Sequence, residues 1–100
     1  MAHRDELLRR NGDLNAIMDG FMSDGALYRF QAICGAVNNT VFNDAVKKQL
    51  TRLTDDGSVI MGYSVSQLAI AALAKFGASK YTGTDQKVKD LIQAKKWFDK

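Results

Sequence analysis

The chain has 100 residues, of which 46% are hydrophobic and 25% are charged, a composition typical of one globular domain with a single core. The formal net charge of +3 is uneven, because residues 75–100 hold seven basic and three acidic side chains, a local +4 that leaves −1 for residues 1–74. The longest apolar run has seven residues (68–74), which excludes a membrane-spanning helix of ~20 residues.

The N-terminal segment, residues 1–12, is charged and leads into no apolar signal core, so we expect a cytoplasmic protein. Arg4 to Arg10 predicts one or two helical turns that fray, ending at Asn11-Gly12. Asp13 is placed to cap the next helix. That helix shows apolar side chains at helical spacing, at Leu14, Ile17, Met18, Phe21 and Met22.

Ser23-Asp24-Gly25 predicts a turn, and a third helix begins at Ala26. Its apolar face comprises Leu27, Phe30, Ile33, Cys34 and Val37, and Asn38-Asn39-Thr40 ends it. A fourth helix is expected from about Val41, with an inward stripe of Phe42, Ala45, Val46, Gln49, Leu50 and Leu53. Asp55-Asp56-Gly57 predicts a second acidic turn.

Residues 58–76 allow two interpretations. They form either one long helix, or a short turn or strand at Val59-Ile60-Met61 followed by a helix from Val65. The second interpretation is favoured by Ser64 and Gln67, which fit a capping box at the start of that helix. Residues 67–76 are apolar nearly all round, which predicts the central buried helix, ending at Gly77.

A polar loop is expected from Ser79 to Gly83, and Thr84 is placed to cap a final helix from Asp85 to Phe98. Its inward positions are Val88, Leu91, Ile92 and Phe98, with Trp97 near the rim. No segment shows sustained alternation with a period of two. The sequence therefore predicts one all-α domain, residues 1–100, of about five to six helices.

The two acidic turns lie 32 residues apart, each between two amphipathic patterns. Leu53-Thr54-Asp55-Asp56-Gly57-Ser58-Val59 and the alanine-rich run from Ser66 to Gly77 resemble a HEAT-type repeat. The resemblance spans residues 14–98, with Val46–Gly77 as one unit, Leu14–Val37 as an earlier one and Asp85–Phe98 as a closing helix. It implies scaffolding through a helical surface and no chemistry. The spacing is shorter than the roughly 40 residues of that family, so a non-repetitive helical bundle stays open.

Groups that could carry chemistry are sparse. Cys34 and His3, the only cysteine and the only histidine, are 31 residues apart, so they form no metal cluster. The acidic neighbours Asp5-Glu6 and Asp55-Asp56 cannot converge on one substrate atom as an acid and a base. We expect Cys34 to be a small buried residue. The predicted protein is therefore not an enzyme and has neither cofactor nor metal.

The basic C-terminal quarter is the candidate binding region. Lys89, Gln93, Lys96 and Lys100 recur at helical spacing. The full set of candidate partner-binding residues is Lys80, Tyr81, Lys87, Lys89, Lys95, Lys96 and Trp97. The loop from Gly77 to Thr84 also has residue types of a phosphate-binding loop, in the wrong order.

We predict a small protein that binds another macromolecule, most readily a protein, as an inhibitor or accessory factor of the phage or mobile-element type. The alternative is a nucleic-acid-binding regulator, in which the lysines follow phosphates and Tyr81 or Trp97 stacks on bases. Arginines are absent after Arg52, which disfavours base-specific contacts. A homodimer through Met22, Tyr28 and Met61 is a further outcome, and a membrane partner is not expected.

Overall fold

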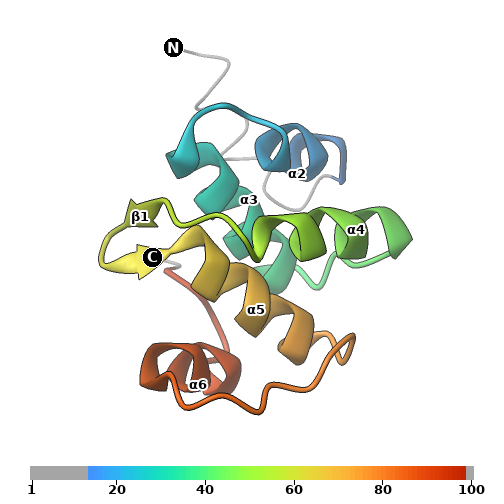
Figure 1. Cartoon of the computed structure of the whole chain (residues 1–100). Coiled ribbons are helices and arrows are strands. Elements are labelled where there is room, and N and C mark those ends of the chain that lie inside the picture. Colours follow the sequence, from blue (N-terminus) through green and yellow to red (C-terminus); the bar gives the residue numbers. More distant parts are fainter. Residues whose placement is uncertain (1–13, 99–100) are drawn as a thin grey trace.

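The computed structural model describes residues 14–98 and forms one mostly helical domain (Figure 1). This part of the chain has five helices and one two-stranded antiparallel hairpin. In order they are α2 (Leu14–Phe21), α3 (Ala26–Asn38), α4 (Asp44–Leu53), β1 (Val59–Ile60), β2 (Tyr63–Ser64), α5 (Val65–Lys75) and α6 (Gln86–Gln93). The predicted all-α class is confirmed, while the expected helix at Arg4–Arg10 and the Asp13 cap lie outside the described residues.

Helices α3 and α5 form the centre of the core. The second half of α3, residues 32–37, is buried on every side, and α5 buries six of its eleven residues. Helix α2 packs on α3, α4 packs on α5, and α6 covers α5 from the other end of the molecule (Figure 1). The expected central position of α5 is therefore confirmed, and α3 shares it. Gly20 lets α2 lie close to α3, because a Cβ there would come within 2.7 Å of Ala32 Cβ.

Two arginines hold the acidic turns in place. Arg29 Nε donates to Asp56 Oδ2 at 2.7 Å, and its Nη1 donates to the Ser23 carbonyl at 2.8 Å. Its Nη2 also donates to Ser58 Oγ at 3.3 Å, so one guanidinium joins the turn before α3 to the turn after α4. Arg52 Nη2 donates to the Phe21 carbonyl at 2.9 Å, at the end of α2. These bonds bring two turns that are 32 residues apart in sequence to one end of the fold.

Helix α4 begins later than expected, at Asp44, because the Asn43 side chain accepts a hydrogen bond from the Val46 N–H at 2.9 Å and caps it. Phe42 and Ala45, predicted to face inward, are exposed. Phe42 instead stacks on Phe76 with ring centroids 4.6 Å apart. The inward stripe of α4 is the narrower set Val46, Leu50 and Leu53.

The second interpretation of residues 58–76 is confirmed. Ile60 pairs with Tyr63 across a two-residue turn, in which Met61 (φ 55°) and Gly62 (φ 84°) both take the left-handed conformation typical of such hairpins. Ser64 then caps α5: its hydroxyl accepts from the Gln67 N–H at 2.9 Å, and Gln67 Oε1 accepts from the Ser64 N–H at 2.8 Å. This reciprocal pair is the capping box that the sequence predicts.

The last helix differs from the prediction. It ends at Gln93 rather than at Phe98, and Ala94, Lys95 and Lys96 run back toward α3 in extended or irregular conformation (Figure 1). Lys75 Nζ, from the end of α5, donates to the carbonyls of Ile92 (3.1 Å) and Ala94 (2.7 Å) and so satisfies acceptors at the end of α6. Between residues 14 and 98 no helix is long and apolar enough to cross a membrane.

Candidate functional site

Two of the seven predicted site residues, Lys87 and Lys89, lie on α6, and the other five lie in the segments before and after it. The cap of α6 bears on what its N-terminus can bind. Asp85, not the predicted Thr84, is the cap: its carboxylate accepts from the Lys87 N–H at 2.9 Å and from Gln67 Nε2 at 2.8 Å. The bond from Gln67, together with the helix N–H groups, lowers the pKa of Asp85. A carboxylate therefore already occupies this helix end, which disfavours phosphate binding between it and the loop from Gly77 to Thr84.

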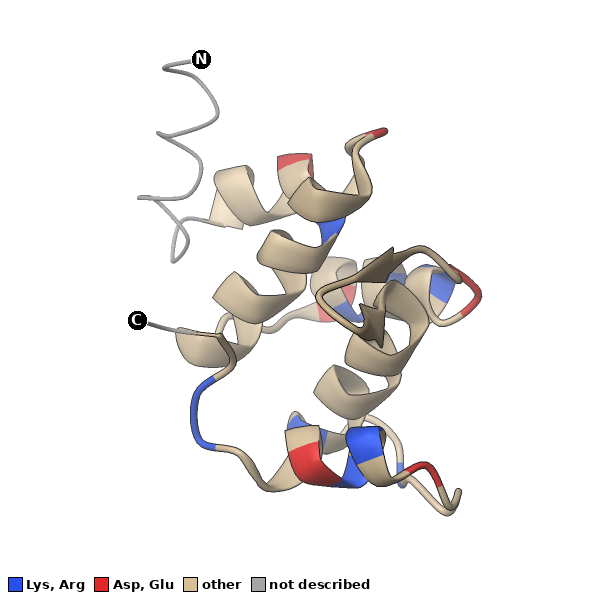
Figure 2. Cartoon of the chain, turned by 90° about the vertical axis from the view of Figure 1, so that its left-hand side faces the viewer, with Lys and Arg blue, Asp and Glu red and all other residues tan. Residues whose placement is uncertain are grey.

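The five predicted lysines divide into two groups. Lys80, Lys89 and Lys95 are exposed and make no hydrogen bond or ion pair with residues 14–98. Lys87 Nζ donates to the Gly62 carbonyl and lies 5.3 Å from the centre of the Tyr63 ring, while Lys96 Nζ donates to the Asn38 carbonyl at 2.9 Å. Because a carbonyl is neutral, neither of these hydrogen bonds pairs an ammonium group with an opposite charge. Figure 2 shows the lysine positions on α6 and on the segment after it.

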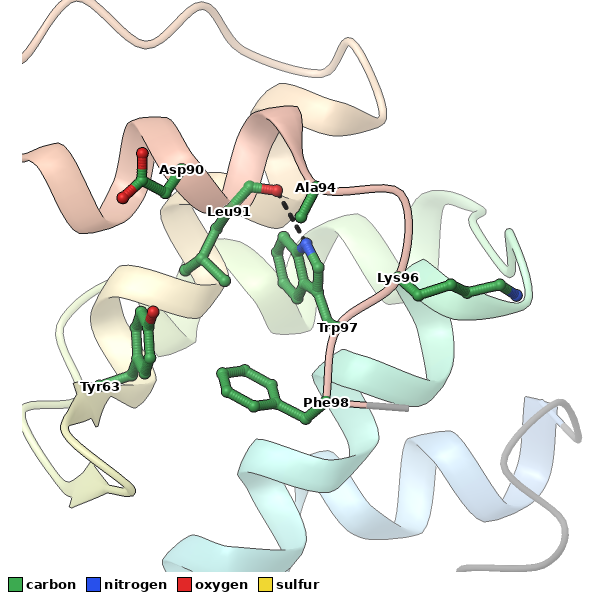
Figure 3. Close-up of a pocket in the computed structure, with 7 residues that line it drawn as sticks. All are labelled: Tyr63, Asp90, Leu91, Ala94, Lys96, Trp97 and Phe98. Atoms are coloured by element: carbon green, nitrogen blue, oxygen red, sulfur yellow. Dashed lines mark hydrogen bonds between the residues drawn. The ribbon is translucent and has the colours of Figure 1, made fainter. Parts of the chain in front are cut away.

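Trp97 is not at a rim, as the sequence suggested, but in the core. It is 1% exposed, and its Nε1 donates to the Leu91 carbonyl at 2.8 Å (Figure 3). The Asn38 amide holds its backbone from both sides, since Oδ1 accepts from the Trp97 N–H at 2.7 Å and Nδ2 donates to the Trp97 carbonyl at 2.9 Å. Trp97 therefore anchors the C-terminal segment to α3, and its ring is not exposed for stacking on bases at the surface.

Tyr81 is likewise part of the internal structure. Its hydroxyl accepts from the Asp85 N–H at 2.9 Å, and its ring packs against the core. The two aromatic residues that were expected to stack on bases are thus both engaged within the protein. The predicted polar stripe along the last helix is also shortened: Lys96 lies beyond the end of α6, and Lys100 lies outside the described residues.

The docking of Trp97 leaves a hollow of about 190 Å³ between α6, the hairpin and the C-terminal segment. Figure 3 shows Tyr63, Leu91 and Phe98 pointing toward a common space, with Trp97 on its inner side. Ala94 also lines it, and Asp90 and Lys96 lie at its edge with their charged ends directed away. The hollow is smaller than the roughly 300–1,000 Å³ of drug-sized ligand sites, so its size suits a single side chain.

Phe98 is the exposed apolar side chain of this lining. It is 40% exposed, and its ring lies between Phe30 (centroids 5.1 Å apart) and Tyr63 (5.2 Å, edge to face). The Tyr63 hydroxyl makes no hydrogen bond within residues 14–98 and is half-buried. The hollow therefore combines an apolar aromatic wall with one hydroxyl able to donate to a ligand.

The groups that could perform chemistry are not assembled in the described part of the chain. Cys34 is buried, and its burial raises the pKa of the thiol to about 12, so it is not a nucleophile near neutral pH. Across residues 14–98 no group of three or more histidine, cysteine, aspartate or glutamate side chains is placed to hold a metal ion.

A second exposed apolar area lies at the two acidic turns that Arg29 and Arg52 hold in place. Met22 (68% exposed) and Leu27 flank the first turn, and Val59 and Met61 (70% exposed) follow the second. We call these four residues the turn face. Of the three residues proposed for a homodimer, Met22 and Met61 are thus exposed, whereas Tyr28 is half-buried beside Gly25. Charged side chains of both signs lie at these turns, since Arg29 pairs with Asp56 and Lys87 Nζ donates to the Gly62 carbonyl.

The hollow is the feature that sequence reasoning missed. Phe98 was expected to face inward on a helix, Tyr63 was given no role, and Ala94 was placed within the helix. The one available signal was Ser64-Val65-Ser66-Gln67, because the capping box fixes the start of α5 and so places Tyr63 in the preceding hairpin.

Comparison with known proteins adds no relative: no family model, no curated protein and no solved structure matches this chain.

Proposed function

We propose that the chain is a non-enzymatic binding protein whose partner is another protein, acting as a small inhibitor or accessory factor. The observation that carries the proposal is the hollow between α6, the hairpin and the C-terminal segment, with exposed Phe98 on its wall. A pocket of this size, lined by aromatic and aliphatic side chains and surrounded by polar ones, is the typical receiving site for an anchor residue of a protein partner.

A nucleic-acid-binding regulator is the second candidate, favoured by three lysines of the basic C-terminal quarter that have no partner within residues 14–98. Lys80 lies in the loop before α6, Lys89 lies on α6 and Lys95 lies in the segment that follows it. All three side chains are exposed and could contact phosphates. We rank it second because Trp97 and Tyr81 are engaged inside the fold, and because residues 75–100 hold no arginine for bidentate contacts to bases.

The proposal also covers the cellular location and the biological role. The single buried thiol fits a reducing compartment, so we propose a cytoplasmic location. We also propose a role in phage or mobile-element biology, and a homodimer through the turn face, whose methionines are exposed.

The test uses a photoreactive benzoylphenylalanine introduced at position 98, on the wall of the hollow, with position 48 on α4 as the matched control. We expect crosslinks to a protein in extracts of the native host from position 98 and not from position 48. Light scattering after size exclusion, with duplex and single-stranded oligonucleotides at low and moderate salt, tests the alternative. A salt-sensitive oligonucleotide complex without a protein crosslink would put nucleic acid first.

A further inference from the structure

The chemistry of the partner follows from the charge around the hollow. Lys87 contacts the Tyr63 ring, Lys96 lies at the edge of the hollow, and Lys95 is next to Lys96. Among residues 14–98, the acidic side chain that lines this edge is Asp90, which accepts a hydrogen bond from Gln86 Nε2 at 2.8 Å. Lys87 and Lys96 therefore outnumber Asp90 at this apolar opening, and Lys95 adds a positive charge in the adjoining segment.

We propose that the hollow binds an acidic segment of the partner protein that carries one large apolar side chain. The apolar side chain enters between Tyr63, Leu91 and Phe98, and flanking carboxylates face the lysines. This inference rests on the proposed function and names the class of its partner. Charge complementarity of this kind selects the partner and speeds association, while the buried anchor supplies most of the affinity.

The Tyr63 hydroxyl adds a polar contact to this geometry. It is half-buried, points toward α6 in Figure 3, and has no hydrogen-bond partner in residues 14–98. As a donor it suits a backbone carbonyl or a carboxylate of the bound segment. A basic segment would be repelled by Lys87, Lys95 and Lys96, and a nucleic acid would leave the small hollow without an apolar anchor.

The experiment is a selection of displayed random peptides on the immobilised full chain. We expect the enriched peptides to combine several acidic residues with one large apolar residue. Binding of a synthetic copy is then measured by fluorescence anisotropy against variants of the protein. Ala94→Phe fills the hollow without removing a core side chain and should weaken binding about tenfold or more. Tyr63→Phe, which removes the hydroxyl alone, should weaken it by less.

The charge contribution is tested with a matched pair of double variants. Lys95→Glu with Lys96→Glu reverses two of the three lysines from which the inference is argued, and we expect weaker and less salt-dependent binding. Lys47→Glu with Lys48→Glu makes the same change on α4, where both lysines are also exposed, and should leave binding nearly unchanged. Circular dichroism of each variant under native conditions checks that the fold is retained.

Several outcomes overturn the inference. Enriched peptides without an acidic bias, or no enrichment at all, would refute an acidic partner, as would binding that Ala94→Phe leaves intact. In those cases the crosslink from position 98 decides separately whether the protein-binding function stands. Displacement of the peptide by an oligonucleotide at moderate salt, without acidic enrichment, would assign the surface to nucleic acid instead.

Discussion

Replacing Trp97 with alanine should cost this protein about 4–5 kcal/mol of unfolding free energy. A tryptophan ring buries about 200 Å², which at about 25 cal/mol per Å² corresponds to about 5 kcal/mol. Residual compactness of the unfolded chain lowers this by about 10–40%, and the lost bond to the Leu91 carbonyl adds about 1 kcal/mol. The result agrees with the ~3–5 kcal/mol typical of large-to-small changes in cores.

The assay is urea unfolding followed by circular dichroism, with tryptophan fluorescence on the unmutated protein. Trp97 is the only tryptophan, so its emission reports this site alone, and it should be blue-shifted in the folded state. Met61→Ala, at a side chain 70% exposed, is the control and should change stability by less than about 0.5 kcal/mol. A loss below about 1 kcal/mol for Trp97→Ala, or water-exposed emission before unfolding, would refute the docking of the C-terminal segment on α3.

Two further predictions concern the Arg29–Asp56 ion pair and the Cys34 thiol. Arg29→Met should cost about 1.5–3 kcal/mol at neutral pH in the same urea assay, because it leaves the Asp56 carboxylate without its charged donor. Burial alone would raise the pKa of Asp56, but hydrogen bonds from Ser58 and Arg29 outweigh it and hold that pKa below the ordinary 3.8. The contribution of the pair is therefore complete above pH 3.8 and is lost as the pH falls through the lower folded value, so the cost of Arg29→Met should shrink in acid; a constant cost across that range would contradict this. Cys34, with a thiol pKa of about 12, should resist alkylation at pH 8 until the protein unfolds, and rapid labelling of the native protein would show that the site is open.

Much of the fold was predictable because it is encoded locally. The spacing of Ile17 and Phe21 predicted α2, and that of Val46, Leu50 and Leu53 predicted α4, because a helix places residues three and four apart on one face. The capping box at Ser64 chose correctly between two interpretations of the following segment. Little of the candidate site was predictable, because the hollow is formed by an irregular segment, a hairpin and a helix that are adjacent only in the folded protein.

The error at the C-terminus has a specific physical cause. Ala94, Lys95 and Lys96 are good helix formers, so propensity favours continuing α6. The structure instead gains the burial of Trp97, two hydrogen bonds between the Trp97 backbone and the Asn38 amide, and two from Lys75 to the end of α6. These tertiary interactions outweigh a preference of a few tenths of a kcal/mol per residue.

The sequence by itself determined the helical class, the two acidic turns, the capping box and the basic character of the C-terminal quarter, because each depends on residues within a few positions of one another. The tertiary structure alone decided where α6 ends, that Trp97 lies in the core, and which lysines stay free. It also created the hollow beside Tyr63 and Phe98. The bonds that decide these points join residues as far apart as Asn38 and Trp97, and no local pattern encodes a contact across 59 positions.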